Sequence, residues 1–322
     1  MDQDNVIIVP GGMNTDLIGL GVERILAPGE LTLGGSFRVS PGGKARNMAE
    51  MAAAFLGKNR VSMIGRTSRD PFGFWEIPLR ALEQAGVNTQ YVRVQDFEES
   101  GCKFPGMALI PVDKNGRNQI YVLPGVNADF SPEDVDAAEN LFSHSDKNKI
   151  LILALEIPKK TAAYCIAKAA RHKIRVILDP GGISEPLDEF LSKDIFLLTP
   201  NEHEMKILTG IELKDFGSAA KASRILLKKG VQNVLITLGP RGAYFFNEII
   251  SLQLPCPKLR NSGIHDETGC GDQVNAVIAA SIAEGKSLVD GISLAVLAGT
   301  LQFYKAGIQP VTKDELLKHI KK

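Results

Sequence analysis

The segment from Asp266 to Asp272, with the sequence DETGCGD, combines residue types that could hold an anion and move a proton. Gly269 and Gly271 allow the backbone to turn tightly and to approach a ligand closely. An apolar helical window follows at Val274–Ala283, so the free N–H groups of residues 269–272 would lie at a helix N-terminus, where they attract anions. Asp272 would be a general base that takes a hydroxyl proton while these amides hold a phosphoryl group. The alternative is a carboxylate that only caps the helix.

A second glycine turn, from Pro41 to Asn47 with the sequence PGGKARN, leads into the helical window Lys44–Leu56. Gly42 and Gly43 would let a small polar ligand come near the backbone. Asn47 offers both a donor and an acceptor to hydroxyl groups. The alternative is an ordinary glycine turn before a helix. The segment is not a Walker A loop, because no Gly-Lys-Ser/Thr sequence closes it.

Two more polar segments follow predicted strands. In GMNTD, Asn14 and Asp16 would hydrogen-bond a polyol at the carboxyl end of the first strand, where open α/β sheets bind ligands. In TPNEHE, Asn201 and Glu204 share one helix face and would position a hydrated Mg²⁺ near phosphates. Helix capping is the alternative for that pair. No GxGxxG follows the first strand, which disfavours a dehydrogenase on a Rossmann fold.

Composition and charge exclude several classes of protein. The 322 residues carry 37 Lys+Arg and 37 Asp+Glu, so no large positive field exists to bind nucleic acid. The apolar run Val6–Val9 is far shorter than the ~18 residues of a membrane span. The acidic first four residues lack the basic start of a signal peptide. Four scattered cysteines suggest neither a zinc site nor a disulfide framework (Cys102, Cys165, Cys256, Cys270). We therefore expect a cytoplasmic protein with no nucleic-acid or membrane partner.

Short apolar strands alternate with helical stretches along most of the chain, which predicts an α/β fold with a mainly parallel sheet covered on both faces. The predicted strands are Val6–Val9, Val61–Ile64, Ile150–Leu155, Ile174–Asp179, Ile195–Leu198 and Val234–Leu238. The helices that position the polar segments are predicted at Lys44–Leu56, at Phe72–Ala85 with Gly86 as its stop, from Ser131-Pro132, and from a capping box at Thr312 and Glu315.

Two stretches break this alternation. Residues 14–40 are rich in Gly and Pro, with short strand candidates at Leu31–Leu33 and Ser36–Ser40. Residues 106–123 predict a hairpin with strands at Met107–Val112 and Gln119–Leu123. These pieces would pair with each other as a small lid.

The four polar segments, in this order and over essentially the whole chain, resemble the ribokinase (PfkB-type) carbohydrate kinase superfamily. GGKARN stands where that family has GGKGAN, DETGCGD matches its DTTGAGD signature, and TPNEHE matches its NxxE motif. Thr237 to Gly242 resembles the strand and turn that contact nucleotide phosphates. The resemblance implies a three-layer αβα core with a mostly parallel sheet and a small β-sheet lid. Residues 1–322 would then form a single kinase domain whose lid comes from insertions at about 14–40 and 100–125.

The resemblance also implies ATP, Mg²⁺ and often K⁺, together with roles for individual residues. Asp272 would be the base, with the anion hole formed by Gly269, Cys270 and Gly271. Asn201 and Glu204 would organise Mg²⁺ and phosphates, and the nucleotide would contact Thr237, Gly239 and Gly242. The sugar would be bound by Asn14, Asp16, Gly42, Gly43, Lys44, Asn47, Ala108, Ile110 and Glu156. The K⁺ site would use Asp266 and Thr268 with the backbone of Gln302, Lys305 and Gly307. Val311 stands where a Ser ligand is common, which weakens the expectation of K⁺.

We expect an ATP-dependent kinase that phosphorylates the primary hydroxyl of ribose or a close relative. Ala45-Arg46 replaces Gly-Ala of the motif, and an Arg before the Asn resembles GGVGRN of pseudouridine kinases, so a nucleoside or pseudouridine kinase is the alternative. Arg46 would then contact a base or a phosphate, unless it leaves the site and pairs with a surface carboxylate. A non-catalytic sugar or nucleotide sensor on the same fold is a further alternative. A homodimer through the lid is expected, with Leu31 or Leu33 at the contact.

Overall fold

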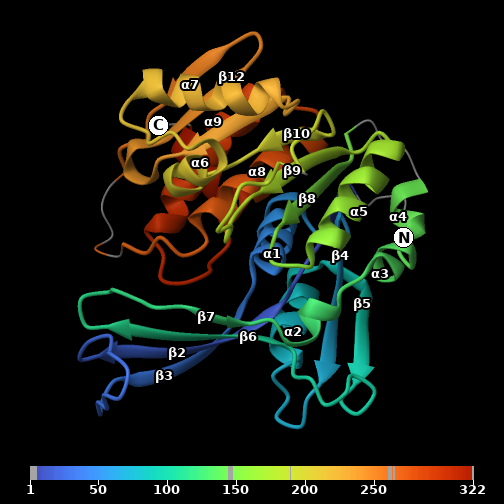
Figure 1. Cartoon of the computed structure of the whole chain (residues 1–322), viewed down its shortest axis with the longest axis vertical. Coiled ribbons are helices and arrows are strands. Elements are labelled where there is room, and N and C mark those ends of the chain that lie inside the picture. The colour runs from blue at the N-terminus through green and yellow to red at the C-terminus, as the bar shows by residue number, and fades with distance from the viewer. Residues whose placement is uncertain (1–5, 144–147, 189, 260–262, 264, 321–322) are drawn as a thin grey trace.

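The computed structural model describes residues 6–143, 148–188, 190–259, 263 and 265–320, so the acidic first residues used above lie outside it. Its larger sheet is mostly parallel, and only the pairs β11–β12 and β12–β13 are antiparallel (Figure 1). Within the described ranges, the strand order is β13 (Ser251–Leu254), β12 (Ala243–Asn247), β11 (Asn233–Thr237), β10 (Ile195–Leu198), β9 (Arg175–Asp179), β8 (Ile150–Ala154), β1 (Ile7–Pro10), β4 (Val61–Arg69) and β5 (Asn88–Asp96).

Helices cover both faces of this sheet and create two apolar cores. One core contains side chains of α1 (Lys44–Leu56), α2 (Glu76–Ala85), α8 (Cys270–Ala283), α9 (Leu288–Phe303) and α10 (Lys313–Ile320). The other contains side chains of α3 (Pro132–Asp136), α4 (Glu139–Ser143), α5 (Lys159–Arg171), α6 (Glu202–Thr209) and α7 (Phe216–Lys228). Short 3₁₀ turns among the described residues are η2 (Gly125–Asp129) and η3 (Gly239–Arg241). The predicted three-layer α/β class is confirmed.

The sequence patterns found the buried elements better than the half-exposed ones. Each of the six predicted strands is present within a residue or two of its predicted start. β1 and β8 are buried and apolar throughout, and β9 has a buried apolar centre. The patterns missed β5 and β13, whose exposed positions carry polar residues, and also β12, which is short and largely buried. The second helix starts at Glu76 and not at Phe72, because the Asp70 carboxylate accepts N–H groups from Phe72 and Trp75 and holds a turn there.

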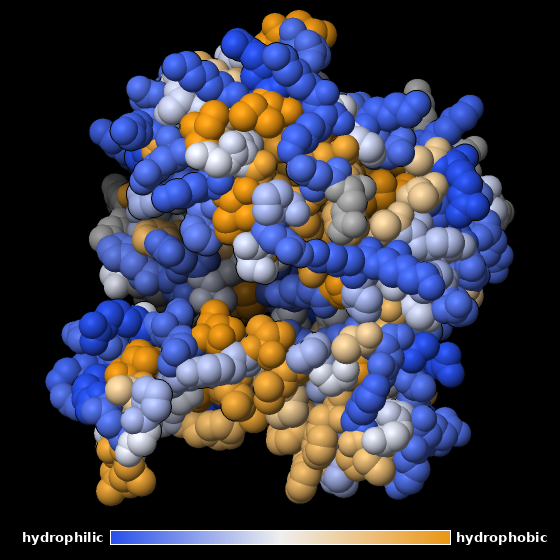
Figure 2. All heavy atoms as spheres, in the orientation of Figure 1, coloured by the Kyte–Doolittle hydropathy of each residue, from blue (hydrophilic) through white to orange (hydrophobic). Residues whose placement is uncertain are grey.

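A smaller sheet projects from this core, with the order β3 (Ser36–Gly42), β2 (Asn14–Val22), β6 (Gly106–Asp113) and β7 (Tyr121–Leu123). The predicted strand at Leu31–Leu33 is wrong: those residues form an exposed loop between β2 and β3. We call the four-stranded sheet the lid sheet. Figure 2 shows apolar side chains gathered over this part of the molecule, next to a hollow between it and the core.

Strand register decides which lid side chains face the core. Asp16 on β2 lies opposite Ser40 on one side and Ala108 on the other. Because side chains alternate along a strand, Asp16, Ala108 and Ile110 share one face. The next row, Leu17 with its partners Val39 and Leu109, occupies the opposite face. One lid face is therefore polar at its centre and the other apolar.

None of the helices described here is long and apolar enough to cross a membrane. All four cysteines are free thiols, as their scattered positions predicted.

Candidate active site

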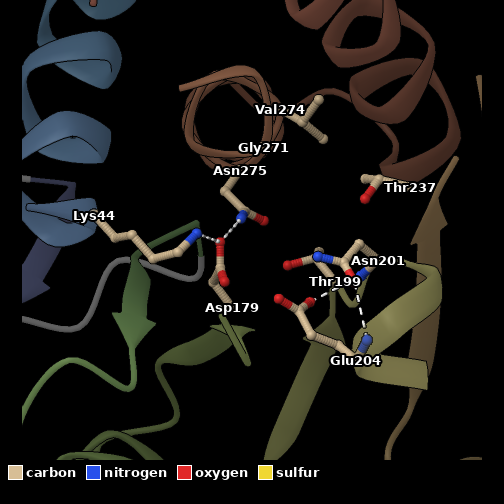
Figure 3. Close-up of a pocket in the computed structure, with 9 residues that line it drawn as sticks. All are labelled: Lys44, Asp179, Thr199, Asn201, Glu204, Thr237, Gly271, Val274 and Asn275. Atoms are coloured by element: carbon tan, nitrogen blue, oxygen red, sulfur yellow. Dashed lines mark hydrogen bonds and ion pairs between the residues drawn. The ribbon is translucent and has the colours of Figure 1, made fainter. Parts of the chain in front are cut away.

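The polar segments meet along one edge of the larger sheet. Strands β11, β10, β9, β8 and β1 are parallel neighbours, so their carboxyl ends and the helix N-termini that follow them lie side by side. A pocket opens there, and its lining residues come from five separate segments of the chain (Figure 3). The lining residues are Lys44, Asp179, Thr199, Asn201, Glu204, Thr237, Gly271, Val274 and Asn275.

Lys44, the first residue of α1, connects two carboxylates of this pocket. Its ammonium lies 3.4 Å from Asp179 and 3.4 Å from Asp272, and its backbone N–H donates to Glu156 at 2.9 Å. The carboxylate of Asp179 is the largest cause of a raised Lys44 pKa. Burial acts in the opposite direction, and the carboxylates of Asp272 and Glu156 raise this pKa further. The side chain is therefore a fixed positive charge in an otherwise acidic site.

Asp272 lies in the first turn of α8 and is only 5% exposed. Its carboxylate accepts a hydrogen bond from the Asn47 amide at 2.8 Å as well as the contact from Lys44. Burial raises the pKa of Asp272, while Lys44 and the Asn47 hydrogen bond act in the opposite direction. The carboxylate thus faces side chains of α1 across the site, which is the placement that a base needs and that a simple helix cap does not require.

The backbone before Asp272 has the form expected of an anion hole. Gly269 precedes the helix with φ 73°, a left-handed conformation that favours glycine. A Cβ added at Gly271 would meet no atom within 4 Å, so open space lies in front of that position. Burial and nearby carboxylates raise the pKa of the Cys270 thiol to about 12, which keeps it neutral. The Cys270 thiol therefore brings no charge to the site, and its backbone N–H donates to the Glu267 carbonyl at 3.2 Å.

Asp179, at the end of β9, is a pocket residue that sequence reasoning missed. Its carboxylate accepts hydrogen bonds from the Asn275 amide at 2.9 Å and from the Gly181 N–H at 2.7 Å, in addition to Lys44. Figure 3 shows Lys44 and Asn275 reaching it from opposite sides. The available signal was an acidic residue followed by Pro-Gly-Gly at a strand end, but no second residue near it in sequence marks it as functional.

Asn201 and Glu204 cap a helix and also line the pocket, so both interpretations of their motif, helix capping and a place in the site, are compatible with the structure. Each side chain accepts the backbone N–H of the other in a capping box, at 2.9 and 2.8 Å, and both also line the pocket. Burial, with Asp179 nearby, raises the pKa of Glu204. A divalent cation would offset the repulsion between the carboxylates of Asp179 and Glu204. Mg²⁺ suits a site with few protein oxygens because it retains water. Within the described ranges, no cluster of three or more His, Cys, Asp or Glu side chains forms a preassembled metal cage.

The predicted nucleotide residues divide into two groups. Thr237 ends β11 and lines the pocket. Gly239 and Gly242 belong to the following turn and are not among the lining residues. A Cβ at Gly242 would lie 2.0 Å from the carbonyl oxygen of Leu254, so strand packing alone requires glycine there.

The predicted sugar residues gather beside the pocket, around the N-terminus of α1. A Cβ at Gly42 would lie 2.2 Å from both carboxylate oxygens of Asp16, so this glycine makes room for that side chain. Asn14 is held by the Asn127 amide at 2.9 Å. Gly43, with φ 94°, starts α1 and aims Lys44 and Asn47 inward. Asn14, Asp16 and Asn47 thus present polar groups close to Asp272.

Comparison with known proteins identifies the fold and the chemistry. A family model described as pfkB family carbohydrate kinase matches residues 4–314. This chain belongs to that family. The ribokinase of Haemophilus influenzae is 30% identical over 318 residues, 98% of each chain, and the deoxyribokinase of Salmonella typhimurium is 30% identical over 304 residues, 94% of each. The structure of Arabidopsis thaliana ribokinase complexed with ribose and ATP has a TM-score of 0.84 at 27% identity and covers 99% of both chains.

The protein is therefore a carbohydrate kinase, a phosphotransferase with an alcohol acceptor. Its residues expected to hold K⁺ are brought together but are already bonded to one another. Asp266 accepts N–H groups from Thr268 at 2.9 Å and Gly307 at 2.7 Å. The carbonyl groups of Thr268 and Gly307 both accept the Gln302 side-chain amide, and the Gln302 backbone carbonyl accepts the Lys305 N–H at 2.9 Å. This donor set does not fit a bound monovalent cation without rearrangement.

The kinase should bind its sugar in a pH-dependent way through Asp16. Burial raises the pKa of Asp16 to about 6, against a lowering by Arg46. Above pH 6 the carboxylate would be ionised and would accept sugar hydroxyls if Asp16 contacts the sugar; as the pH falls through 6 it would gain a proton and lose acceptor capacity. We expect the KM for the sugar to rise below pH 6 while the KM for the nucleotide stays constant. Steady-state kinetics between pH 5 and 8 measure this.

The matched control is Asp16→Asn, which has the same shape and no titration in this range. Its sugar KM should be higher than that of the wild type at pH 8 and should not vary with pH. A wild-type sugar KM that is flat from pH 5 to 8 would contradict the assignment of Asp16 to the sugar.

Proposed function

We propose that this kinase transfers the γ-phosphoryl group of ATP to the primary hydroxyl of ribose or a related sugar. The observation that carries the proposal is the buried Asp272 carboxylate at the start of α8, held by Lys44 and Asn47 beside the open space at Gly271. The ribokinases and the deoxyribokinase among its relatives support a pentose as the acceptor.

In the proposed reaction, Asp272 takes the proton of the attacking hydroxyl as it approaches the γ-phosphorus in line with the leaving oxygen. The N–H groups of residues 269–271 stabilise the charge that develops on the transferred group. Lys44 keeps Asp272 ionised and supplies positive charge to the same space. Asn14, Asp16 and Asn47 orient the sugar so that only one hydroxyl reaches the base.

Mg²⁺ would neutralise the negative charge of the phosphate oxygens and so make the γ-phosphorus more open to attack by the hydroxyl. Asp179, Asn201 and Glu204 are the residues that would hold it, directly or through water. Their oxygen donors and the raised pKa of Glu204 support a cation of high charge at this position. Thr237 would lie near the nucleotide phosphates.

A sugar acceptor is favoured over a nucleoside because Arg46 is occupied. Its guanidinium is buried and binds Glu50 at 2.6 Å and the Asn47 side chain. It therefore pairs with a carboxylate of its own helix, inside the protein and not at the surface, and its full burial keeps it from being presented to a base. This leaves the pseudouridine kinase alternative without its motivating residue.

A substrate panel tests the proposal: ribose, deoxyribose, fructose, pseudouridine, adenosine and fructose 6-phosphate, with ADP release measured by a coupled assay. We expect the highest kcat/KM for a free pentose. A higher value for pseudouridine would overturn the substrate assignment. Absence of turnover with every acceptor, together with binding of sugar or ATP by calorimetry, would indicate the non-catalytic sensor.

We also propose that residues 1–322 act as one kinase domain with the lid sheet as its cover, and that two copies associate through the lid. The outer lid face carries the row Val39, Leu17, Leu109 and Tyr121, three of which are at least 37% exposed. Exposed apolar area of this extent is typical of an interface. The loop residues Leu31 and Leu33 lie at the same end of the molecule and are more exposed still. A cytoplasmic location remains a prediction from the four free thiols.

Light scattering tests the dimer. We expect the wild-type mass at micromolar concentration to be twice that of the chain, and Leu109→Glu to halve it by placing a charge in the apolar row. The control is Ile249→Glu, which adds the same charge at an exposed position between β12 and β13 and should leave the mass unchanged. A monomeric wild type would refute the proposal.

A further inference from the structure

Arg46 occupies an unusual position for an arginine, because its side chain is fully buried inside the first turn of α1. Its Nη1 donates to Glu50 at 2.6 Å. Its Nε and Nη2 both donate to one atom, the Oδ1 of Asn47, at 3.2 and 2.5 Å. Burying an arginine costs free energy unless its donors are satisfied, and here Glu50 and Asn47 provide the partners.

The two donors on one oxygen determine which way the Asn47 amide points. An amide can present either its oxygen or its nitrogen in a given direction, since the two ends have nearly the same shape. With Oδ1 held by Arg46, the Nδ2 end must face Asp272, to which it donates at 2.8 Å. The hydrogen bonds therefore form a chain from Glu50 through Arg46 and Asn47 to Asp272.

We propose that Arg46 is a positioning residue for phosphoryl transfer: it locks the Asn47 amide so that Nδ2 holds the Asp272 carboxylate in its reactive orientation. This proposal rests on Asp272 being the base. The positive charge of Arg46 also lies close enough to Asp16 and Asp272 to interact with both carboxylates. Removing Arg46 would release Oδ1 and free the amide to rotate, so that Nδ2 would hold the Asp272 carboxylate in its reactive orientation for only part of the time.

A double-mutant cycle tests the proposal, using the acceptor that the wild type phosphorylates best. We expect Arg46→Met to lower kcat by about 10- to 100-fold, the usual cost of disturbing a group that orients a catalytic side chain. The KM for ATP should stay constant, and the acid limb of the kcat profile should move to higher pH. In an Asn47→Ala background, Arg46→Met should cause no further loss of kcat, because the group through which it acts is absent.

Two controls separate positioning from folding. Arg46→Lys keeps the charge without the paired donors, and we expect an intermediate kcat. Arg66→Met removes another partly buried ion pair, with Asp134 at 2.7 Å, and should lower the melting temperature without moving the acid limb. If Arg46→Met does not fold, the kcat and acid limb of Arg46→Lys decide. Losses of kcat that multiply in the cycle, or an unmoved acid limb, would overturn the proposal. Asp272→Asn in the same assay tests the role of Asp272 as the base separately.

A second observation concerns Gln302, which is fully buried at the end of α9. Its amide nitrogen donates to the carbonyl of Gly307 at 2.7 Å and to that of Thr268 at 3.2 Å. These two carbonyls belong to the loops that flank the anion hole. Two converging carbonyl groups repel each other unless a positive group lies between them. Here a side chain of the protein supplies the hydrogen atoms that separate them.

The charge of Asp266 in the same place is also compensated internally. Burial alone would raise the pKa of Asp266. This pKa is nevertheless below its ordinary value because Asp266 accepts hydrogen bonds from Thr268 and Gly307 and lies near the positive charge of Arg38. Arg38 reaches this loop from lid strand β3: a Cβ at Gly307 would lie 3.0 Å from its guanidinium. The carboxylate therefore has donors and a positive charge without an added ion.

We infer that the Gln302 amide stands in for a monovalent cation, so that the anion hole keeps its shape and the kinase works without K⁺. Activity and melting temperature are measured in choline chloride and in KCl at equal ionic strength. For the wild type, we expect both to be the same in the two salts. For Gln302→Ala, we expect kcat to fall in choline chloride and to recover in KCl, with a melting temperature that rises on addition of KCl.

Gln309→Ala is the matched control, because this exposed glutamine donates only to the Ala306 carbonyl in a neighbouring turn. It should respond to neither salt. A wild type that K⁺ stimulates several-fold, or stabilises against unfolding, would overturn the inference and would show that the amide turns away to admit the ion. If Gln302→Ala does not fold, the two wild-type measurements decide.

Discussion

Asp272→Asn should lower kcat by roughly 10²–10⁴, the contribution typical of a general base. The amide has nearly the same shape as the carboxylate and can keep a hydrogen bond to Asn47, but it cannot accept the proton of the attacking hydroxyl. Binding should change far less, because the sugar and the nucleotide are held by other residues. A coupled ADP-release assay measures kcat, and calorimetry measures the two dissociation constants.

The variant's folding must be checked, since Asp272 is buried and bonded to α1. The substitution replaces a buried charged carboxylate with a neutral amide and so removes the free-energy cost of burying that charge. We therefore expect a melting temperature equal to or above that of the wild type. Turnover close to the wild-type rate in a folded variant would exclude Asp272 as the base. A loss confined to KM, with kcat unchanged, would show that it only binds the sugar.

Lys44→Met should lower kcat by about 10²–10³, as expected when one preorganised donor to a reacting anion is lost. Methionine keeps the length and the apolar part of the side chain, so the change removes mainly the charge. Without the ammonium, Asp179 and Asp272 face each other uncompensated. The pKa of Asp272 should then rise further, because Lys44 is the main group that lowers it.

The direction of the pH effect follows from that change. Catalysis needs the ionised form of Asp272, so the acid limb of the kcat profile should move to higher pH in Lys44→Met. Lys44→Arg, which keeps a positive charge, should move it less. Profiles of kcat between pH 5 and 9 distinguish the variants. An acid limb at the wild-type position in Lys44→Met would contradict the contact between Lys44 and Asp272.

The predicted elements that proved correct are those whose pattern reflects burial along a continuous segment. The strand at Ile195–Leu198 and the helix at Lys44–Leu56 have the predicted bounds. The strand is a short unbroken apolar run, and the apolar residues of the helix repeat with the helical period. Leu31–Leu33 has the same local pattern as a strand but lacks a partner to pair with, and it forms a loop. Strand pairing is a contact between distant segments and is not visible in a window of a few residues.

The amino-acid sequence by itself indicated the family and the four polar segments, and it singled out Asp272 as the proposed base, since glycine turns before helices and a carboxylate at a helix start are local features. Only the tertiary structure decided what those side chains face. Asp179 lines the pocket because β9 lies between β8 and β10 in the sheet. Arg46 turned out to hold Asn47, and Gln302 to bridge Thr268 and Gly307. Which groups meet in these contacts depends on the direction and burial of each side chain. The spacing of residues along the sequence contains no information about either.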